Sequence, residues 1–267
     1  MLKFKNLAAS LGAALILTTS YLPVYANTNE FIDVSQASTG LVKVNYTAPT
    51  NSRLKLLIEK DGERKSYDIS PNKLESFPLT FDSGNYKIRI MENTTGNSYK
   101  ALYSKDVNVS LASSQSVFLA STQTINWTPE MAPIKKAAEL TKNLNTDQEK
   151  VMAIYNYVIN NYKYDYQKAA SVKPGYVPSI IDTYNSNTGI CYDYSTLFAA
   201  MLRSQGIPTK VVKGYTSYVD EYHAWNEVLI NGNWVTVDTT FDAAYSQSGK
   251  NVQFAKPSNE YKTTAEV

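Results

Sequence analysis

Residues 189–208, GICYDYSTLFAAMLRSQGIP, decide how the second half of this chain folds. The stretch opens on a glycine and the chain's one cysteine, Cys191, and it closes on Gly206-Ile207-Pro208. Apolar residues recur between these ends at helical spacing, namely Leu197, Phe198, Met201 and Leu202. Glycine, an apolar residue and then proline are typical of a helix end. The pattern therefore predicts a helix over residues 191–204, with Cys191 at its N-terminus.

The position of Cys191 favours a reactive cysteine over a packed one. Backbone N–H groups without helical acceptors and the positive end of the helix dipole both favour a thiolate at a helix N-terminus. The same N–H groups could hold a developing oxyanion. Gly189 lets the backbone approach closely before the turn. An inert, buried cysteine is the alternative, but it would need neither the glycine nor the terminal position.

A predicted hairpin brings the chain's one histidine, His223, close to Asp238. Asn231-Gly232 is the strongest two-residue signal for a hairpin turn. Counting outward from that loop, His223 faces Thr240, and Asp238 lies two residues from Thr240 on the same face of the sheet. Diagonal neighbours of this kind are within side-chain reach. A loop longer or shorter by one residue would reverse the parity.

Cys191, His223 and Asp238 together predict thiol catalysis. Cys191 is the candidate nucleophile, and His223 is the base that takes its proton and later protonates the leaving amine. Asp238 would fix the imidazole tautomer and stabilise the imidazolium. Asp242 is a second candidate for the aspartate, but it lies beyond the predicted ladder. One cysteine and one histidine fall short of the usual zinc ligand set, so we expect neither a metal nor a cofactor.

Three segments resemble those of the transglutaminase-like superfamily. Residues 189–208 are similar to its cysteine segment, residues 222–228 (YHAWNEV) to its histidine segment, and residues 234–242 (WVTVDTTFD) to its aspartate segment. The likeness covers roughly residues 135–245. The order of the three segments makes the resemblance specific, because each alone would be a weak signal.

The resemblance implies a papain-like thiol fold, with Cys191, His223 and Asp238 as its triad and acyl transfer through a thioester. Members include protein crosslinkers, peptidases and amidases, and others have lost catalysis. Family members often use an upstream aromatic or amide side chain to assist the oxyanion, for which Tyr164 and Tyr166 are both candidates. The sequence has no acidic cluster like the calcium sites of animal crosslinking enzymes.

The segment before residue 128 predicts a β-sandwich, of immunoglobulin-like type. Short runs with period two or β-branched residues recur between turn signals, at residues 41–46, 55–59, 86–90, 101–107 and 116–120. Asp61-Gly62 is a hairpin signal. The sequence indicates no ligand for this domain.

The segment from residue 128 onward predicts a transglutaminase-like α+β catalytic domain. Thr128-Pro129-Glu130 is typical of a helix start, and Thr146 with Glu149 forms a capping box for a second helix. Residues 165–188 are expected to cross irregularly and to wall a cleft. Strands are predicted over residues 209–215, 223–230 and 234–238, and a frayed tail after Asp242.

Residues 1–26 are typical of a secretory signal. A basic start is followed by an apolar run at residues 7–17 and by Val24-Tyr25-Ala26, an acceptable cleavage site. A short membrane anchor is the alternative. The predicted organisation is a signal peptide at 1–26, a β-sandwich domain at 27–127 and a catalytic domain at 128–267. We expect a secreted or cell-surface protein that meets the membrane only through the signal segment before cleavage.

The charge of the chain argues against nucleic acid as a partner. Removal of residues 1–26 takes away two lysines and no acid, which leaves 24 basic and 24 acidic side chains. Without a basic patch, neither nucleic acid nor an anionic membrane surface is indicated.

Two functions therefore compete. The first is a cysteine-dependent acyl-transfer enzyme that acts on amide bonds of a peptide or protein substrate. A substrate associated with the cell wall is one alternative. For this enzyme, protease or amidase activity is slightly favoured over transglutaminase activity. The second is a non-catalytic adhesion or scaffold module of the cell surface with an unused triad.

Overall fold

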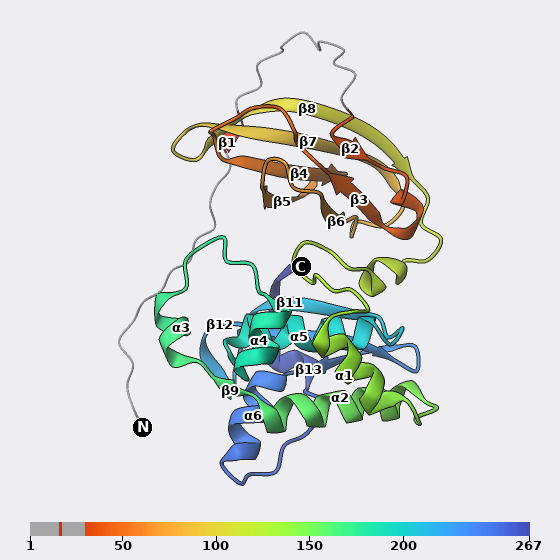
Figure 1. Ribbon diagram of the computed structural model, residues 1–267, viewed down its shortest axis with the longest axis vertical. Coiled ribbons are helices and arrows are strands. Elements are labelled where there is room, and N and C mark those ends of the chain that lie inside the picture. The colour runs from red at the N-terminus through yellow and green to blue at the C-terminus, as the bar shows by residue number, and fades with distance from the viewer. Residues whose placement is uncertain (1–15, 18–29) are drawn as a thin grey trace. The chain divides into compact units, whose positions relative to one another are not determined.

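The computed structural model describes residues 16–17 and 30–267, which form two compact units (Figure 1). Unit 1 ends at Ser114 and unit 2 begins at Gln115. The predicted signal segment lies outside the described residues except for Ile16–Leu17, the two-residue strand β1. No helix in the described part of the chain has both the length and the apolar character needed to cross a bilayer.

Unit 1 is built from two sheets over a shared core. The larger sheet has the order β1-β8-β7-β4-β5, and the smaller has the order β2-β3-β6. Their strands are β2 (Ile32–Asp33), β3 (Leu41–Val44), β4 (Leu54–Lys60), β5 (Glu63–Ile69), β6 (Glu75–Pro78), β7 (Gly84–Thr95) and β8 (Ser98–Val109). A short 3₁₀ helix, η1, covers Ala37–Thr39.

Both sheets of unit 1 contribute side chains to one apolar core. Val42 and Phe77 come from the smaller sheet, while Leu56 and Ile88 come from the larger one, and all four are fully buried. Alternating strands that bury one face in this way produce the two-layer arrangement predicted from the sequence. The Asp61-Gly62 turn joins β4 to β5, with both residues at positive φ, as the sequence indicated.

Unit 2 is an α+β unit with its helices next to an antiparallel sheet. Its helices are α1 (Ala132–Thr141), α2 (Asp147–Asn161), α3 (Tyr166–Ser171), α4 (Ile180–Ser186), α5 (Cys191–Arg203) and α6 (Thr239–Gln247). The sheet has the order β13-β12-β11-β14, with β11 (Thr209–Thr216), β12 (Val219–Ile230), β13 (Asn233–Val237) and β14 (Tyr261–Glu266). Two short strands, β9 (Lys163–Tyr164) and β10 (Thr188–Gly189), pair in parallel. Two 3₁₀ helices, η2 (Ser116–Leu119) and η3 (Ser258–Glu260), complete the unit.

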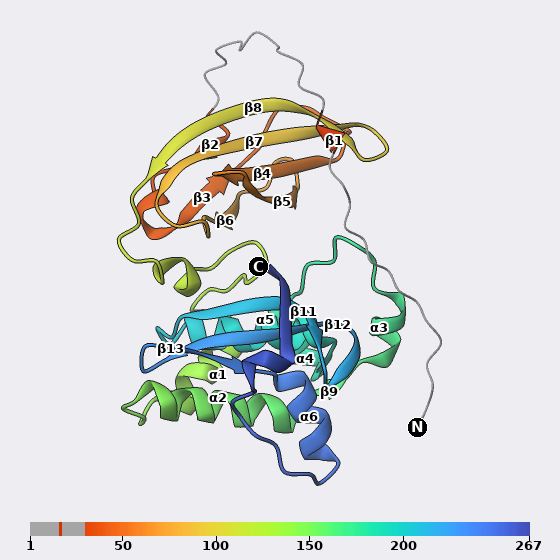
Figure 2. The same cartoon turned by 180° about the vertical axis from the view of Figure 1, so that it is seen from behind.

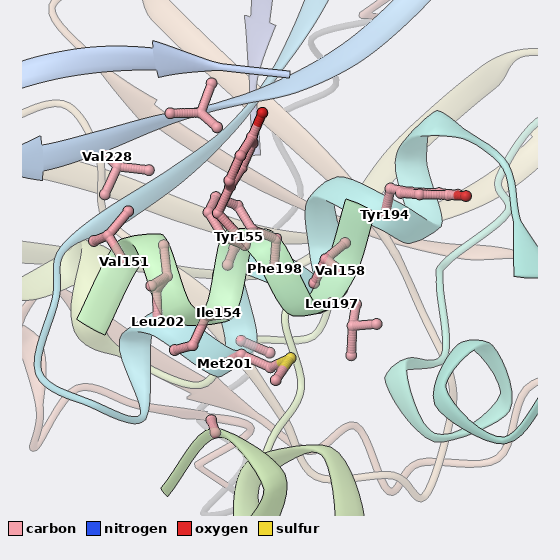
Figure 3. Close-up of a cluster of buried hydrophobic side chains, with 14 of the residues drawn as sticks. Val151, Ile154, Tyr155, Val158, Tyr194, Leu197, Phe198, Met201, Leu202 and Val228 are labelled. Carbon is pink, nitrogen blue, oxygen red and sulfur yellow. The ribbon is translucent and has the colours of Figure 1, made fainter. Parts of the chain in front are cut away.

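The core of unit 2 forms where α2 and α5 meet the sheet (Figure 3). The labelled side chains come from α2 (Val151, Ile154, Tyr155 and Val158), from α5 (Tyr194, Leu197, Phe198, Met201 and Leu202) and from β12 (Val228). The capping box of α2 is present, since Thr146 Oγ1 accepts from the Glu149 backbone N–H and Glu149 Oε2 accepts from the Thr146 N–H. Burying α5 in this way fixes its N-terminus, and with it the position of Cys191.

Several sequence predictions for these elements are wrong. The first helix begins at Ala132 rather than at Thr128, because Pro133 occupies its first turn, where a missing N–H costs nothing. Residues 116–120, predicted as a strand, contain the 3₁₀ helix η2. The irregular segment 165–188 contains the short helices α3 and α4, each with a side-chain N-cap, from Asp165 and Ser179 respectively.

The chain after Asp242 is ordered, in contrast to the frayed tail expected from its polar sequence. Strand β14 adds to the edge of the sheet beside β11, and Figure 2 shows this last segment in dark blue. Gly214 of β11 allows the close approach, because a Cβ there would lie 2.0 Å from the carbonyl oxygen of Lys262. Backbone pairing holds β14 beside β11, and Tyr261 is buried in a cluster with Val212 and Trp225. Neither contact follows from the polar composition of the segment.

Candidate active site

Cys191 occupies the first turn of α5, as the sequence predicted. Ile190 is the N-cap residue in an extended conformation, and the Cys191 side chain is half-buried rather than sealed in the core. The first N–H groups of a helix have no acceptor four residues earlier, so a side chain at this position lies near hydrogen-bond donors. This arrangement leaves the sulfur available to a substrate.

A buried carboxylate, Asp193, holds the chain segment that leads to Cys191 in place. Asp193 Oδ2 accepts from the Ile190 backbone N–H at 2.8 Å and lies 2.7 Å from Lys168 Nζ. Its other oxygen accepts from the Tyr176 hydroxyl at 2.5 Å. The side chain is fully buried, so each of these partners offsets the cost of burying its charge. Asp193 thereby ties the 165–189 segment to α5.

Gly189 is needed because of Asp193. A Cβ at residue 189 would lie 2.7 Å from the Asp193 Cβ, closer than real contacts of this kind. We expect Gly189→Ala to lower the free energy of unfolding by about 1–3 kcal/mol, the usual range for overpacking. Urea denaturation measures the change, and Gly189→Ala in an Asp193→Gly background, which lacks the opposing Cβ, is the control. An equal loss in both backgrounds would contradict the contact with Asp193.

His223 and Asp238 form a direct hydrogen bond. His223 Nε2 lies 2.8 Å from Asp238 Oδ2, and both side chains are buried. The predicted hairpin register is confirmed, because Ile230 pairs with Asn233 across the Asn231-Gly232 turn. With Nε2 engaged by Asp238, the second ring nitrogen of His223 is left for the thiol of Cys191, whose side chain interacts with the imidazole.

The strand does not continue to Thr240, and the predicted pairing of His223 with Thr240 does not form. β13 ends at Val237, and α6 begins at Thr239. Asp238 is the N-cap of α6, where its Oδ1 accepts from the Phe241 N–H at 3.0 Å. One carboxylate thus caps a helix with one oxygen and holds the imidazole with the other.

Tyr261 is a residue of the site that sequence reasoning missed. Its hydroxyl donates to Asp238 Oδ2 at 3.0 Å, the same oxygen that binds His223. Tyr261 comes from β14, in the tail expected to fray, so no local signal pointed to it. Its ring also packs edge-on against Trp225, at 5.0 Å between centroids. The carboxylate is therefore held by three donors from three separate elements.

The electrostatics of the pair favour imidazolium and carboxylate. Burial disfavours the charged imidazole, but Asp238 and then Cys191 outweigh burial and raise the pKa of His223 to about 10. Burial likewise opposes the Asp238 carboxylate, yet His223, the Phe241 N–H and Tyr261 hold the pKa of Asp238 below its usual range. The carboxylate bonded directly to the ring is the reason that the pKa of His223 lies above its ordinary value.

These shifts define the pH window in which the pair stabilises the fold. The folded pKa of His223 lies above its unfolded value of about 6.5, so its contribution is complete below that value and is lost as pH rises through about 10. The folded pKa of Asp238 is lowered, so its contribution is present above the ordinary aspartate range and is lost as pH falls.

Asp242, the second aspartate candidate, is engaged elsewhere. Its carboxylate accepts from the Tyr155 hydroxyl at 2.8 Å and forms a buried ion pair with Lys256. Burial raises the pKa of Asp242 to about 6, although both partners oppose the shift. His223 therefore has Asp238, and not Asp242, as its carboxylate partner.

Of the two tyrosines considered for the oxyanion, Tyr164 is the one that interacts with Cys191. β9 places Tyr164 beside Gly189 of β10, and the Tyr164 side chain interacts with Cys191. Burial first, and then the charge of Cys191, raise the pKa of Tyr164, which keeps its hydroxyl protonated. Tyr166 is 75% exposed and contacts the Tyr164 ring.

A metal centre is not indicated by the geometry. Over residues 30–267, no three His, Cys, Asp or Glu side chains are grouped in a way that could hold a metal ion. The site instead offers a thiol, an imidazole, a carboxylate and several hydroxyl donors. This donor set suits nucleophilic attack on a carbonyl with proton transfer by the imidazole.

The matched family agrees with this arrangement. Residues 134–239 match the sequence model of the family described as the transglutaminase-like superfamily. The matched segment contains Cys191, His223 and Asp238. It ends before Tyr261 and does not include unit 1.

The sequence relatives each cover 39% of this chain. The human kyphoscoliosis peptidase is 31% identical over 116 residues, which is 39% of this chain and 17% of that protein. The YebA protein of Bacillus subtilis is 29% identical over 126 residues, again 39% of this chain and 17% of the relative. The solved periplasmic domain of TgpA from Pseudomonas aeruginosa aligns with 80% of this chain and 93% of that one, at 14% identity and a TM-score of 0.40. The chain thus spans only about a sixth of the length of these two sequence relatives.

Proposed function

Because residues 134–239 are a domain of the transglutaminase-like superfamily, we propose that this protein is a cysteine-dependent acyl-transfer enzyme acting on amide bonds of peptides or proteins. The observation that carries the proposal is the bond from His223 Nε2 to Asp238 Oδ2, made by an imidazole that also interacts with Cys191. A scaffold module has no use for a half-buried thiol beside an oriented imidazole.

In the proposed first step, the Cys191 thiolate attacks the carbonyl carbon of the amide. The carbonyl oxygen becomes an oxyanion, and the tetrahedral intermediate then collapses with cleavage of the C–N bond. The leaving nitrogen takes its proton from the His223 imidazolium, and the acyl group remains on sulfur as a thioester. Asp238 holds the ring in orientation throughout.

In the second step, an acceptor attacks the thioester. His223, now neutral, takes a proton from the acceptor, and the C–S bond breaks to restore the thiolate and the imidazolium. Water as acceptor gives hydrolysis, and a lysine amine gives a crosslink. We propose hydrolysis as the principal reaction, which agrees with the peptidase name of the human relative.

We propose the Tyr164 hydroxyl, together with the first-turn N–H groups of α5, as donors to the oxyanion. Tyr164 is half-buried near Cys191, and its raised pKa keeps the donor proton in place. Donors fixed before the reaction stabilise the developing charge without reorganisation.

We also propose that the enzyme works outside the cytoplasm, as a secreted or cell-surface protein. The support is the pattern of residues 1–26, with its basic start and apolar run. In this proposal the partners are peptide or protein substrates, cell-wall associated ones included, and unit 1 serves for positioning or binding.

Alkylation of Cys191 is the direct test of the proposed function. We expect iodoacetamide to label Cys191 in the native protein faster than it labels the urea-unfolded chain at the same pH, because the fold pairs the thiol with the imidazolium. Intact mass spectrometry measures the labelling rate. Peptidase activity, assayed with a peptide library, should disappear with labelling and in Cys191→Ala.

The control is Ser195→Ala, a variant in the same helix but one helical turn beyond the cysteine. It should keep both the labelling rate and the activity. Slower labelling in the folded protein than in urea, together with equal activity of Cys191→Ala and the wild type, would favour a non-catalytic scaffold.

A further inference from the structure

A second cation, Lys213, lies beside the candidate nucleophile. Lys213 belongs to β11 and pairs with Ala224, the residue after His223. Its ammonium lies 3.4 Å from the centre of the Tyr192 ring, and Tyr192 follows Cys191 in the chain. Lys213 also interacts with the charge of the Cys191 side chain. The thiol therefore has a cation from β11 as well as the imidazole from β12.

The strand register shows that Lys213 is directed toward α5. Residues paired across antiparallel strands lie on the same face of the sheet, so Lys213 shares a face with Ala224. Asn226, two residues further along β12, shares that face and donates to the carbonyl oxygen of Ser195 in α5. The lysine is thus on the side of the sheet where α5 begins with Cys191.

Lys213 has no carboxylate partner within the described part of the chain. The ion pairs of residues 30–267 do not include it, although the neighbouring Lys210 pairs with both Glu227 and Glu266. Lys213 is itself half-buried. Burial lowers the pKa of Lys213 to about 8, and the charge of Cys191 opposes this shift. Desolvating an ammonium that has no carboxylate partner costs free energy, and a ligand carboxylate at this position would offset that cost.

The proposed reaction removes the thiolate charge that acts on Lys213. In the proposed acylation, the thiolate becomes a neutral thioester, and the imidazolium becomes a neutral imidazole because its proton leaves with the amine. Asp238 remains charged, but its oxygens are bound by His223, Tyr261 and the Phe241 N–H. In the thioester state, no carboxylate of residues 30–267 pairs with the Lys213 ammonium, and a carboxylate on the substrate would restore the charge balance.

We propose that Lys213 binds a carboxylate of the substrate close to the scissile amide, and that it is a specificity-determining residue. The inference rests on the proposed function and names its substrate class: peptides with a carboxylate near the cleaved bond. Tyr192 holds the ammonium over its ring, which keeps the lysine in place without neutralising its charge.

Two alkylating reagents that differ in charge test this proposal without knowledge of the natural substrate. Iodoacetate carries a carboxylate next to the reacting carbon, and iodoacetamide carries a neutral amide at the same position. We expect Lys213→Met to lower the ratio of the iodoacetate rate to the iodoacetamide rate at Cys191 by at least about fivefold, near neutral pH and at low salt. Lys213→Arg should keep the wild-type ratio.

The matched control is Lys142→Met, which removes the same charge from an exposed position at the C-cap of α1. It should leave the ratio unchanged, and Lys213→Gln replaces Lys213→Met if the latter fails to fold. An unchanged ratio in Lys213→Met or Lys213→Gln, with iodoacetamide labelling intact, would overturn the role of Lys213 alone. Failure of iodoacetamide to label native Cys191 selectively would instead contradict the proposed function.

Protection by peptides identifies the source of the carboxylate. One probe is a blocked tripeptide with a free C-terminus, and the other is its C-terminal amide with an internal glutamate. If the first peptide slows iodoacetamide labelling, the substrate carboxylate is an α-carboxylate. If the second peptide slows it, the carboxylate belongs to an acidic side chain. In both cases the protection should be lost in Lys213→Met. Protection no better than that of a peptide without any carboxylate would contradict the proposal.

Discussion

Replacing His223 with alanine is expected to lower kcat/KM by about 10²–10⁴-fold, the range usual for loss of a general base. The imidazole is the one group bonded to Asp238 that also interacts with Cys191. Without it, the site loses the oriented group that takes the thiol proton and passes it to the leaving amine. Steady-state kinetics with a cleaved peptide measures the loss.

Two controls separate a lost base from a damaged fold. Tyr222→Phe changes the residue before His223 and removes only an exposed hydroxyl bonded to Thr264, so activity should stay within about twofold. Added imidazole should restore part of the His223→Ala activity, since it can enter the vacated space. An unaltered kcat/KM in His223→Ala would refute the role assigned to the histidine.

Replacing Asp238 with asparagine is expected to move the alkaline limb of the pH–rate profile downward by more than about one pH unit. In the wild type, the carboxylate helps to raise the pKa of His223 to about 10, so the imidazolium that protonates the leaving amine persists well above neutrality. Without the negative charge, that proton is lost at lower pH. The profile of kcat/KM against pH measures the shift.

The same substitution should also lower kcat/KM by about 10²-fold or more at the optimum. An asparagine amide can donate to Nε2, which would place the remaining ring proton on the nitrogen needed for the thiol. Tyr261→Phe is the matched control, because it removes one donor to Oδ2 and leaves the carboxylate in place. In Tyr261→Phe the alkaline limb should lie at higher pH than in Asp238→Asn. Alkaline limbs at the same pH in the two variants would contradict the role of the carboxylate charge.

Local sequence patterns determined the elements that carry the candidate triad. The helix that begins at Cys191 follows from its apolar spacing and its glycine–proline end, and the structure has it from Cys191 to Arg203. The hairpin register follows from Asn231-Gly232, because a two-residue turn and the two-residue period of a strand set which side chains share a face. The catalytic roles of Cys191, His223 and Asp238 stay predictions that the experiments above test.

Contacts between distant segments were decided only by the tertiary structure. Tyr261 reaches Asp238 because β14 pairs with β11 through backbone hydrogen bonds, which leave no periodic signal in the side chains. Lys213 is one lysine among many in the sequence, and only the packing of β11 against α5 brings it to Cys191. Spacing along the chain predicts which face a side chain is on, whereas burial and the sum of nearby charges depend on all the segments that fold around it.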